Sequence, residues 1–134
     1  LPDDPSIEVV TYLSRCFEEY RGFPQVMQAL AVLQQQRPKV HLLLAGSDEI
    51  AYGKPRADGR SWRQWAMDEL PLDPARTHWL GILQTDCYEQ LLACSDVHVY
   101  FTVPFVLSWS LLEAMAAGPL FCAVPERDVV WGCE

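Results

Sequence analysis

The chain has few basic residues and no long apolar run. Ten lysines and arginines stand against eighteen aspartates and glutamates, giving a formal net charge of −8 at pH 7. Binding to nucleic acid or to an anionic membrane depends on clustered Lys and Arg, so the composition argues against both partners. No apolar stretch approaches the roughly 20 residues that a membrane-spanning helix needs. The sequence therefore predicts a soluble domain, and peripheral membrane attachment of a longer parent chain stays open.

Several signatures of catalysis and metal binding are missing. The five cysteines show no C-x-x-C spacing and lie mostly in apolar runs, which favours the cytosol as the compartment. The chain has no G-x-S-x-G elbow. His41, His78 and His98 lie in or beside predicted strands without a second ligand at metal spacing. A structural role is therefore favoured for them, and no metal site is predicted.

Short apolar segments alternate with segments of helical periodicity. Strands are predicted over residues 7–13, 40–45, 77–80, 96–101 and 119–124, and helices over 23–33, from 62 to 66, from 88 to 92 and over 108–117. A strand, a helix and a strand within about 35 residues form a right-handed crossover with parallel strands. We therefore expect one Rossmann-like domain over residues 1–134, a doubly wound parallel sheet in a three-layer α/β/α arrangement.

The carboxyl ends of the predicted strands carry the candidate binding residues, because doubly wound sheets bind ligands at this edge. The residues that follow the first four strands are Arg15 and Arg21, Gly46 and Ser47, Gly81, and the segment 102–108. The two guanidinium groups suit a diphosphate, which they can grip by charge-assisted hydrogen bonds. The alternative is that they form weak surface ion pairs with Glu18 and Glu19.

Glu113 is a carboxylate on an otherwise apolar helical face. Burying it costs free energy unless something hydrogen-bonds it, so the position indicates either a polar ligand or an internal partner. The helix that carries it begins after a loop, and its first amide groups suit a phosphate. Trp109, beside the helix start, belongs either to the core or to a site where an aromatic ring stacks on a base or a sugar.

These segments resemble the C-terminal, donor-binding half of retaining glycosyltransferases of family four, also called group one, which have two Rossmann-like domains (the GT-B fold). The resemblance lies in Tyr12 to Arg15 with Arg21 and Gly22, in His41 to Gly46, in Thr77 to Gly81, in Tyr88 to Asp96 and in Ser108 to Gly118. It implies a domain that binds a nucleotide-diphosphate sugar of the UDP or GDP type. It also implies transfer of a hexosyl group, with retention, to a glycan or lipid-linked acceptor, without a metal or another cofactor.

The resemblance implies a role for each matched position. Arg15 and Arg21 are the implied catalytic residues, since they would contact the diphosphate whose charge grows as the glycosidic bond breaks. Glu113 would hydrogen-bond the ribose hydroxyls, and the amides around Ser108 would hold phosphate oxygens. The whole implied donor-binding set is Arg15, Arg21, Gly46, Ser47, Gly81, Ser108, Trp109, Ser110 and Glu113.

The sequence departs from the family pattern at two positions of this region. Phe105 stands where the family has the first of its paired glutamates, and Ser108 stands where it generally has glycine. The first departure supports an alternative function, a non-catalytic interaction or nucleotide-binding module that has lost transfer activity. The acceptor-binding N-terminal domain of the family has no counterpart here. We therefore expect a piece of a longer enzyme, which by itself binds the donor only.

Overall fold

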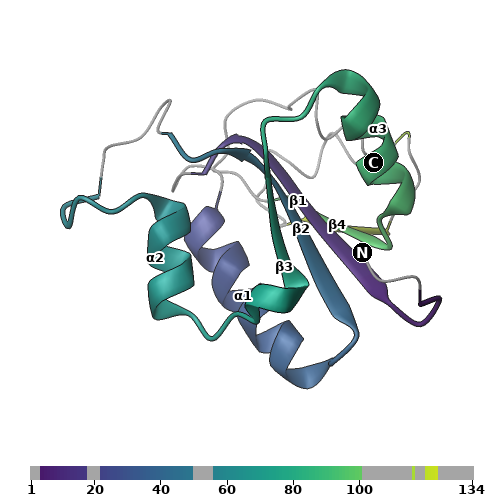
Figure 1. Ribbon diagram of the computed structural model, residues 1–134, viewed down its shortest axis with the longest axis horizontal. Coiled ribbons are helices and arrows are strands. Elements are labelled where there is room, and N and C mark those ends of the chain that lie inside the picture. The colour runs from purple at the N-terminus through teal and green to yellow at the C-terminus, as the bar shows by residue number, and fades with distance from the viewer. Residues whose placement is uncertain (1–3, 18–21, 50–55, 101–115, 117–119, 124–134) are drawn as a thin grey trace.

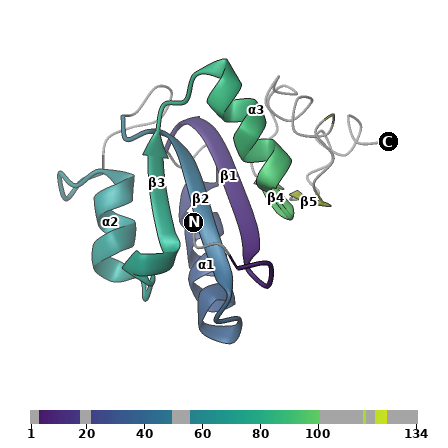
Figure 2. The same ribbon diagram turned by 45° about the vertical axis from the view of Figure 1, so that its right-hand side comes forward.

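The computed structural model describes residues 4–17, 22–49, 56–100, 116 and 120–123. Within them, five parallel strands form one sheet in the order β3-β2-β1-β4-β5 (Figures 1 and 2). The strands are β1 (Glu8–Cys16), β2 (Val40–Ser47), β3 (Thr77–Gly81), β4 (Val97–Tyr100) and β5 (Leu120–Ala123). This topology is the parallel sheet that the alternating sequence pattern predicts.

Three α-helices and one short 3₁₀ helix connect the described strands. They are α1 (Phe23–Gln36), α2 (Trp62–Glu69), η2 (Pro74–Arg76) and α3 (Thr85–Cys94). The helix predicted over 108–117 lies outside the described residues except for Ala116, which is helical. None of the helices in the described ranges has the length and apolar character needed to cross a bilayer.

The helices cover both faces of the sheet, with α1 and α2 on one face and α3 on the other (Figure 1). Along β2, Leu42 and Leu44 belong to the core on the α1 side, whereas Leu43 and Ala45 belong to the core on the α3 side. Successive side chains of a strand point to opposite faces, so burial of both sets requires a helical layer on each face. The predicted Rossmann-like α/β/α fold is confirmed.

Three strands run further toward their carboxyl ends than predicted. The apolar pattern stops at Leu13 in β1, but the strand continues to Cys16, which pairs with Ser47 at the end of β2. Polar residues and glycines can continue a backbone ladder after the apolar pattern has ended. As a correction, the four candidate residues that the sequence places after strands lie within the strands, close to their ends: Arg15, Gly46, Ser47 and Gly81.

Gln34 ties α1 to the segment that leads into β3. The side chain is 2% exposed, and its Nε2 donates to the Arg76 carbonyl oxygen and to Thr77 Oγ1, both at 3.1 Å. Its Oε1 accepts a hydrogen bond from the Asp73 amide at 3.0 Å. These bonds fix where the chain enters the edge strand of the sheet.

Replacing Gln34 by leucine should lower the free energy of unfolding by about 2 kcal/mol, because buried backbone groups lose their partners while the side-chain volume is kept. Urea denaturation measures this difference. Gln35→Leu, at an exposed position of the same helix, is the matched control and should change stability by no more than about 0.5 kcal/mol. Equal stability of the two variants would show that the Gln34 bonds contribute nothing.

Candidate functional site

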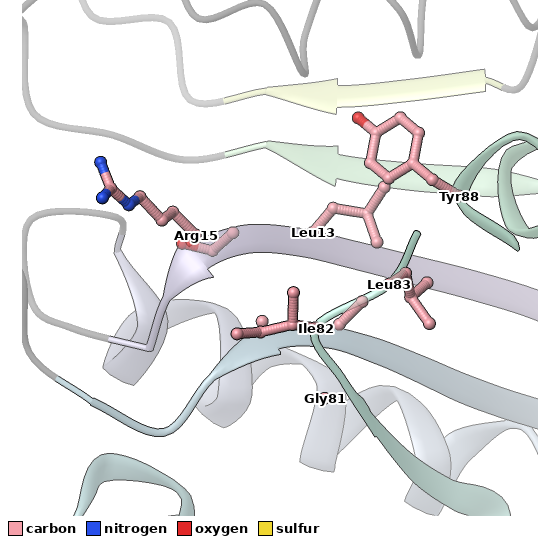
Figure 3. A pocket seen from close by; sticks show the side chains of 9 residues that line it. Leu13, Arg15, Gly81, Ile82, Leu83 and Tyr88 are labelled. Atoms are coloured by element: carbon pink, nitrogen blue, oxygen red, sulfur yellow. The ribbon is translucent and has the colours of Figure 1, made fainter. Parts of the chain in front are cut away.

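A hollow of about 350 Å³ lies at the carboxyl ends of β1, β2 and β3. It opens on the α3 side of the sheet, because Leu13 and Ala45 face α3 and Tyr88 comes from α3 itself. The described lining residues are Leu13, Ser14, Arg15, Ala45, Gly46, Gly81, Ile82, Leu83 and Tyr88. Figure 3 shows Arg15 reaching beyond the end of β1 while the Tyr88 ring stands over Leu13. The hollow lies where doubly wound sheets bind their ligands.

The structure brings together three of the candidate residues. Arg15, Gly46 and Gly81 come from three different strands and line the same hollow. Ser47 ends β2 and is not among the described lining residues. The remaining candidates lie outside the residues that the structure describes: Arg21, Ser108, Trp109, Ser110 and Glu113.

Two β-bulges shape this edge of the sheet. Leu13 pairs with Ala45 and Cys16 with Ser47, so β1 takes three steps where β2 takes two. On the other side of β2, the register shifts again between Leu44 and Ala45, where β3 carries one extra residue. A bulge bends its strand and redirects the neighbouring side chains. Both irregularities meet at the level of Ala45, beside the hollow.

Gly46 allows β1 and β2 to approach each other closely. A Cβ at this position would lie 2.4 Å from the Ser14 carbonyl oxygen and 3.0 Å from Cε1 of Phe17, and the residue has φ +154°. Immediately beyond, the Phe17 amide donates to the Ser47 carbonyl oxygen at 2.8 Å. Only a residue without a side chain fits here, because the nearest atom belongs to the backbone and cannot rotate away.

The apolar walls of the hollow were not predicted from the sequence, where the candidates are mainly charged, polar or glycine residues. Leu13, Ala45, Leu83 and Tyr88 supply apolar surface, and Ile82 is 80% exposed. The alternation of side chains along each strand would have placed Leu13 and Ala45 on one face. Among the described lining residues, Arg15 is the one that carries a formal charge. Apolar walls with a few placed polar groups are typical of small-molecule sites.

Two other arginines from the first half of the chain are occupied by carboxylates. Arg56 and Arg60 each form an ion pair with Asp58 at 2.9 Å, and Arg60 also contacts Asp68 and Glu69 at 3.3 and 3.1 Å. The hydrogen bond from the Arg56 side chain, with those from Arg60, holds the pKa of Asp58 well below its usual range. These two guanidinium groups are therefore already paired with carboxylates, and neither is among the described residues that line the hollow.

The three histidines take part in contacts within the fold. His98 is 0% exposed, its Nδ1 lies 2.8 Å from Thr11 Oγ1, and burial lowers its pKa to about 4. His41 Nδ1 lies 3.0 Å from His78 Nε2, and burial lowers the pKa of both rings. None of the three is among the described residues that line the hollow. Within the part of the chain that the structure describes, no three potential metal ligands gather in one place.

Solved structures similar to this chain include glycosyltransferases. Anabaena HepE in complex with UDP and glucose matches 93% of the chain at 23% identity and a TM-score of 0.71. A trehalose-6-phosphate synthase, studied for glycosyl transfer with retention, matches 94% at 13% identity and a TM-score of 0.72. The sucrose-phosphate synthase of Thermosynechococcus elongatus matches 88% at 20% identity and a TM-score of 0.64.

The likeness is one of fold. The chain spans 31%, 32% and 28% of the length of these three proteins, so it corresponds to about a third of each. No protein-family model matches the chain, and no curated protein is similar enough to match it. At such low identities the comparison shows the Rossmann-like fold alone, which the chain shares with part of each of these proteins. The ligands and reactions named for these proteins are stated for those proteins alone.

Proposed function

We propose that this chain is the donor-binding domain of a glycosyltransferase. The enzyme would transfer a hexosyl group, with retention, from a nucleotide-diphosphate sugar of the UDP or GDP type to a glycan or lipid-linked acceptor. The chain would form the C-terminal half of a GT-B enzyme of family four, and the other half would hold the acceptor. The proposal is supported by the sequence resemblance and by the fold shared with a protein that holds UDP and glucose.

The observation that carries the proposal is the meeting of Arg15, Gly46 and Gly81 at one hollow. Three strand ends supply a cation and two glycines around a volume of about 350 Å³, which lies within the usual range for small-molecule sites. The cation suits a diphosphate, and the apolar walls suit the uncharged parts of a nucleotide sugar. One site thus offers complementary surface to both parts of such a donor.

Arg15 would act on the leaving group. As the bond between the anomeric carbon and the phosphate oxygen breaks, negative charge grows on the diphosphate. A guanidinium that donates to this charge binds the transition state more strongly than the ground state, which accelerates the reaction. Arg21 would add a second cation, Glu113 would hold the ribose, and Trp109 with the amides around Ser108 would complete the site. These last roles rest on the sequence resemblance.

Isothermal titration of the chain with UDP and GDP tests the proposal. We expect one of the two to bind with a dissociation constant in the micromolar to millimolar range. Arg15→Ala should weaken that binding about 10- to 100-fold, as expected for the loss of charge-assisted hydrogen bonds. The same substitution should leave the binding of the corresponding nucleoside unchanged, because the nucleoside lacks the diphosphate.

Arg37→Ala is the matched control for this titration. Arg37 is the residue that follows α1, and its guanidinium pairs with Glu8 at the start of β1, so its loss removes the same charge at the opposite edge of the sheet. At constant ionic strength the dissociation constant of this variant should match that of the wild type. A folded chain that binds neither UDP nor GDP, or an Arg15→Ala variant with wild-type affinity, would contradict the proposed site.

The non-catalytic alternative is favoured by one observation, Phe105 in place of the glutamate that the family resemblance leads one to expect. Such a module would still bind the nucleotide. A protein that contains both halves of the GT-B fold should therefore be incubated with UDP-glucose and GDP-mannose. Release of nucleoside diphosphate supports the enzyme, whereas donor binding without release on any acceptor tested supports the module.

A further inference from the structure

We infer that Ser14 is a positioning residue that fixes how Arg15 enters the hollow, an inference that rests on the proposed nucleotide-sugar function. Ser14 lies next to Arg15 in the bulged part of β1. The hydrogen bonds between strands use backbone groups only, so the Ser14 side chain is not needed to form the strand. The hydrogen bond that this side chain makes can therefore serve another purpose.

The first contact is a hydrogen bond across the bulge. Ser14 Oγ donates to the Cys16 carbonyl oxygen at 2.7 Å. Residues 14 and 16 flank Arg15, so this bond joins the backbone on the two sides of the arginine. Local hydrogen bonds from serine to the backbone two residues away stabilise turns and similar irregular conformations. The Ser14 hydroxyl thus holds the bulge closed around Arg15.

The second set of contacts fixes the bulge to β2. The Ser14 carbonyl oxygen occupies the space that a side chain at Gly46 would need, 2.4 Å from the position of its Cβ. On the far side of Arg15, the Phe17 amide bonds to the Ser47 carbonyl oxygen at 2.8 Å. Because Leu13 also pairs with Ala45, the backbone before and after Arg15 is held on the same neighbouring strand.

This anchoring matters because the Arg15 residue itself is exposed. A long exposed side chain loses rotamer freedom when it binds a ligand. If the backbone that carries it is already fixed, the total loss of conformational entropy on binding is smaller. The planar fork of a guanidinium also has to meet the phosphate oxygens at a defined angle. A bulge that turns even slightly would point the fork away from the diphosphate.

A double-mutant cycle on UDP binding, or GDP binding if that is the nucleotide bound, tests the inference. Ser14→Ala should weaken binding roughly 3- to 10-fold, the range expected for one hydrogen bond, and Ser14→Thr, which keeps the hydroxyl, should restore affinity to within about twofold. In the Arg15→Ala background, Ser14→Ala should add no further loss, because Ser14 acts through Arg15. Equal losses in both backgrounds, or no loss in either, would overturn the inference.

Ser61→Ala is the matched control. The Ser61 hydroxyl also bonds to the backbone, accepting from the Gln64 amide at 3.2 Å at the start of α2, and it is not among the described residues around the hollow. Its loss removes a comparable hydrogen bond and should leave nucleotide affinity unchanged. If Ser61→Ala weakens binding as much as Ser14→Ala, the effect is one of general stability and the inference is wrong.

A second measurement needs no nucleotide. Hydrogen exchange of the Phe17 amide should become roughly 3- to 10-fold faster in Ser14→Ala and stay unchanged in Ser61→Ala, because the first variant loosens the bulge. Unchanged exchange in Ser14→Ala would refute the inference even where UDP binds. A wild-type chain that binds no nucleotide refutes the proposed function instead, and the exchange result then decides by itself whether Ser14 holds the bulge.

Discussion

Replacing Gly46 by alanine should lower the free energy of unfolding by about 4 kcal/mol. The added methyl group would lie 2.4 Å from the Ser14 carbonyl oxygen, so β1 and β2 would have to separate at the point where their bulge is anchored. Overpacking of this kind costs about 1–3 kcal/mol, and a backbone conformation that side chains rarely adopt costs roughly 1–3 more. Urea denaturation measures the loss, and a strongly reduced midpoint temperature reports it if the variant is too unstable.

Substitutions at two other glycines distinguish the cost of the steric clash from the cost of the backbone conformation. Gly59 and Gly81 have φ +76° and +69°, and a Cβ at either would meet no atom within 4 Å. Alanine at these positions should therefore cost only the conformational term, about 1–2 kcal/mol. If Gly46→Ala is no more destabilising than Gly59→Ala, the close approach of β1 and β2 at the hollow is wrong.

The strands of this fold could be predicted because each has an apolar core segment with a distinct pattern. Leu42 to Ala45, for example, is apolar on both faces and is buried on both. The ends of the strands could not be predicted in the same way. Whether Arg15 and Ser47 still belong to strands depends on hydrogen bonds between β1 and β2, which are far apart in the chain. The bulges have the same origin, since a register is a property of two strands together.

The strand-end residues of the candidate site could be predicted from the sequence, whereas the contribution of α3 could not. Parallel strands end at one edge, so any cation or glycine at a strand end is a candidate, and Arg15, Gly46 and Gly81 follow from this rule. The place of Tyr88 depends on how α3 packs over the sheet. Its helical periodicity assigns it to the buried side of α3 but does not say that the ring reaches the strand ends, where it lines the hollow.

Lowering the pH from 7 to 5 should destabilise the chain through His98 by roughly 2 kcal/mol, and lowering it from 7 to 4 should destabilise it by on the order of 3 kcal/mol. Burial lowers the pKa of this imidazole from its ordinary value of 6.5 to about 4, because the charged form would be taken out of water. Between these values the unfolded chain binds a proton that the folded chain does not. Stability therefore falls as the pH falls through this window.

The His98→Gln variant isolates this contribution, because an amide can still bond to Thr11 Oγ1, which lies 2.8 Å from His98 Nδ1, but does not titrate. Its unfolding free energy should fall by about 2 kcal/mol less than that of the wild type between pH 7 and pH 5. His78→Gln is the control, since His78 is only half-buried and its substitution should change the slope much less. Carboxylates with a lowered pKa, such as Asp73, also contribute less to the stability of the folded chain as the pH falls. This loss is the same in all variants, so it cancels when their unfolding free energies are compared. Parallel pH profiles of the wild type and His98→Gln would mean that His98 does not remain neutral in the folded chain.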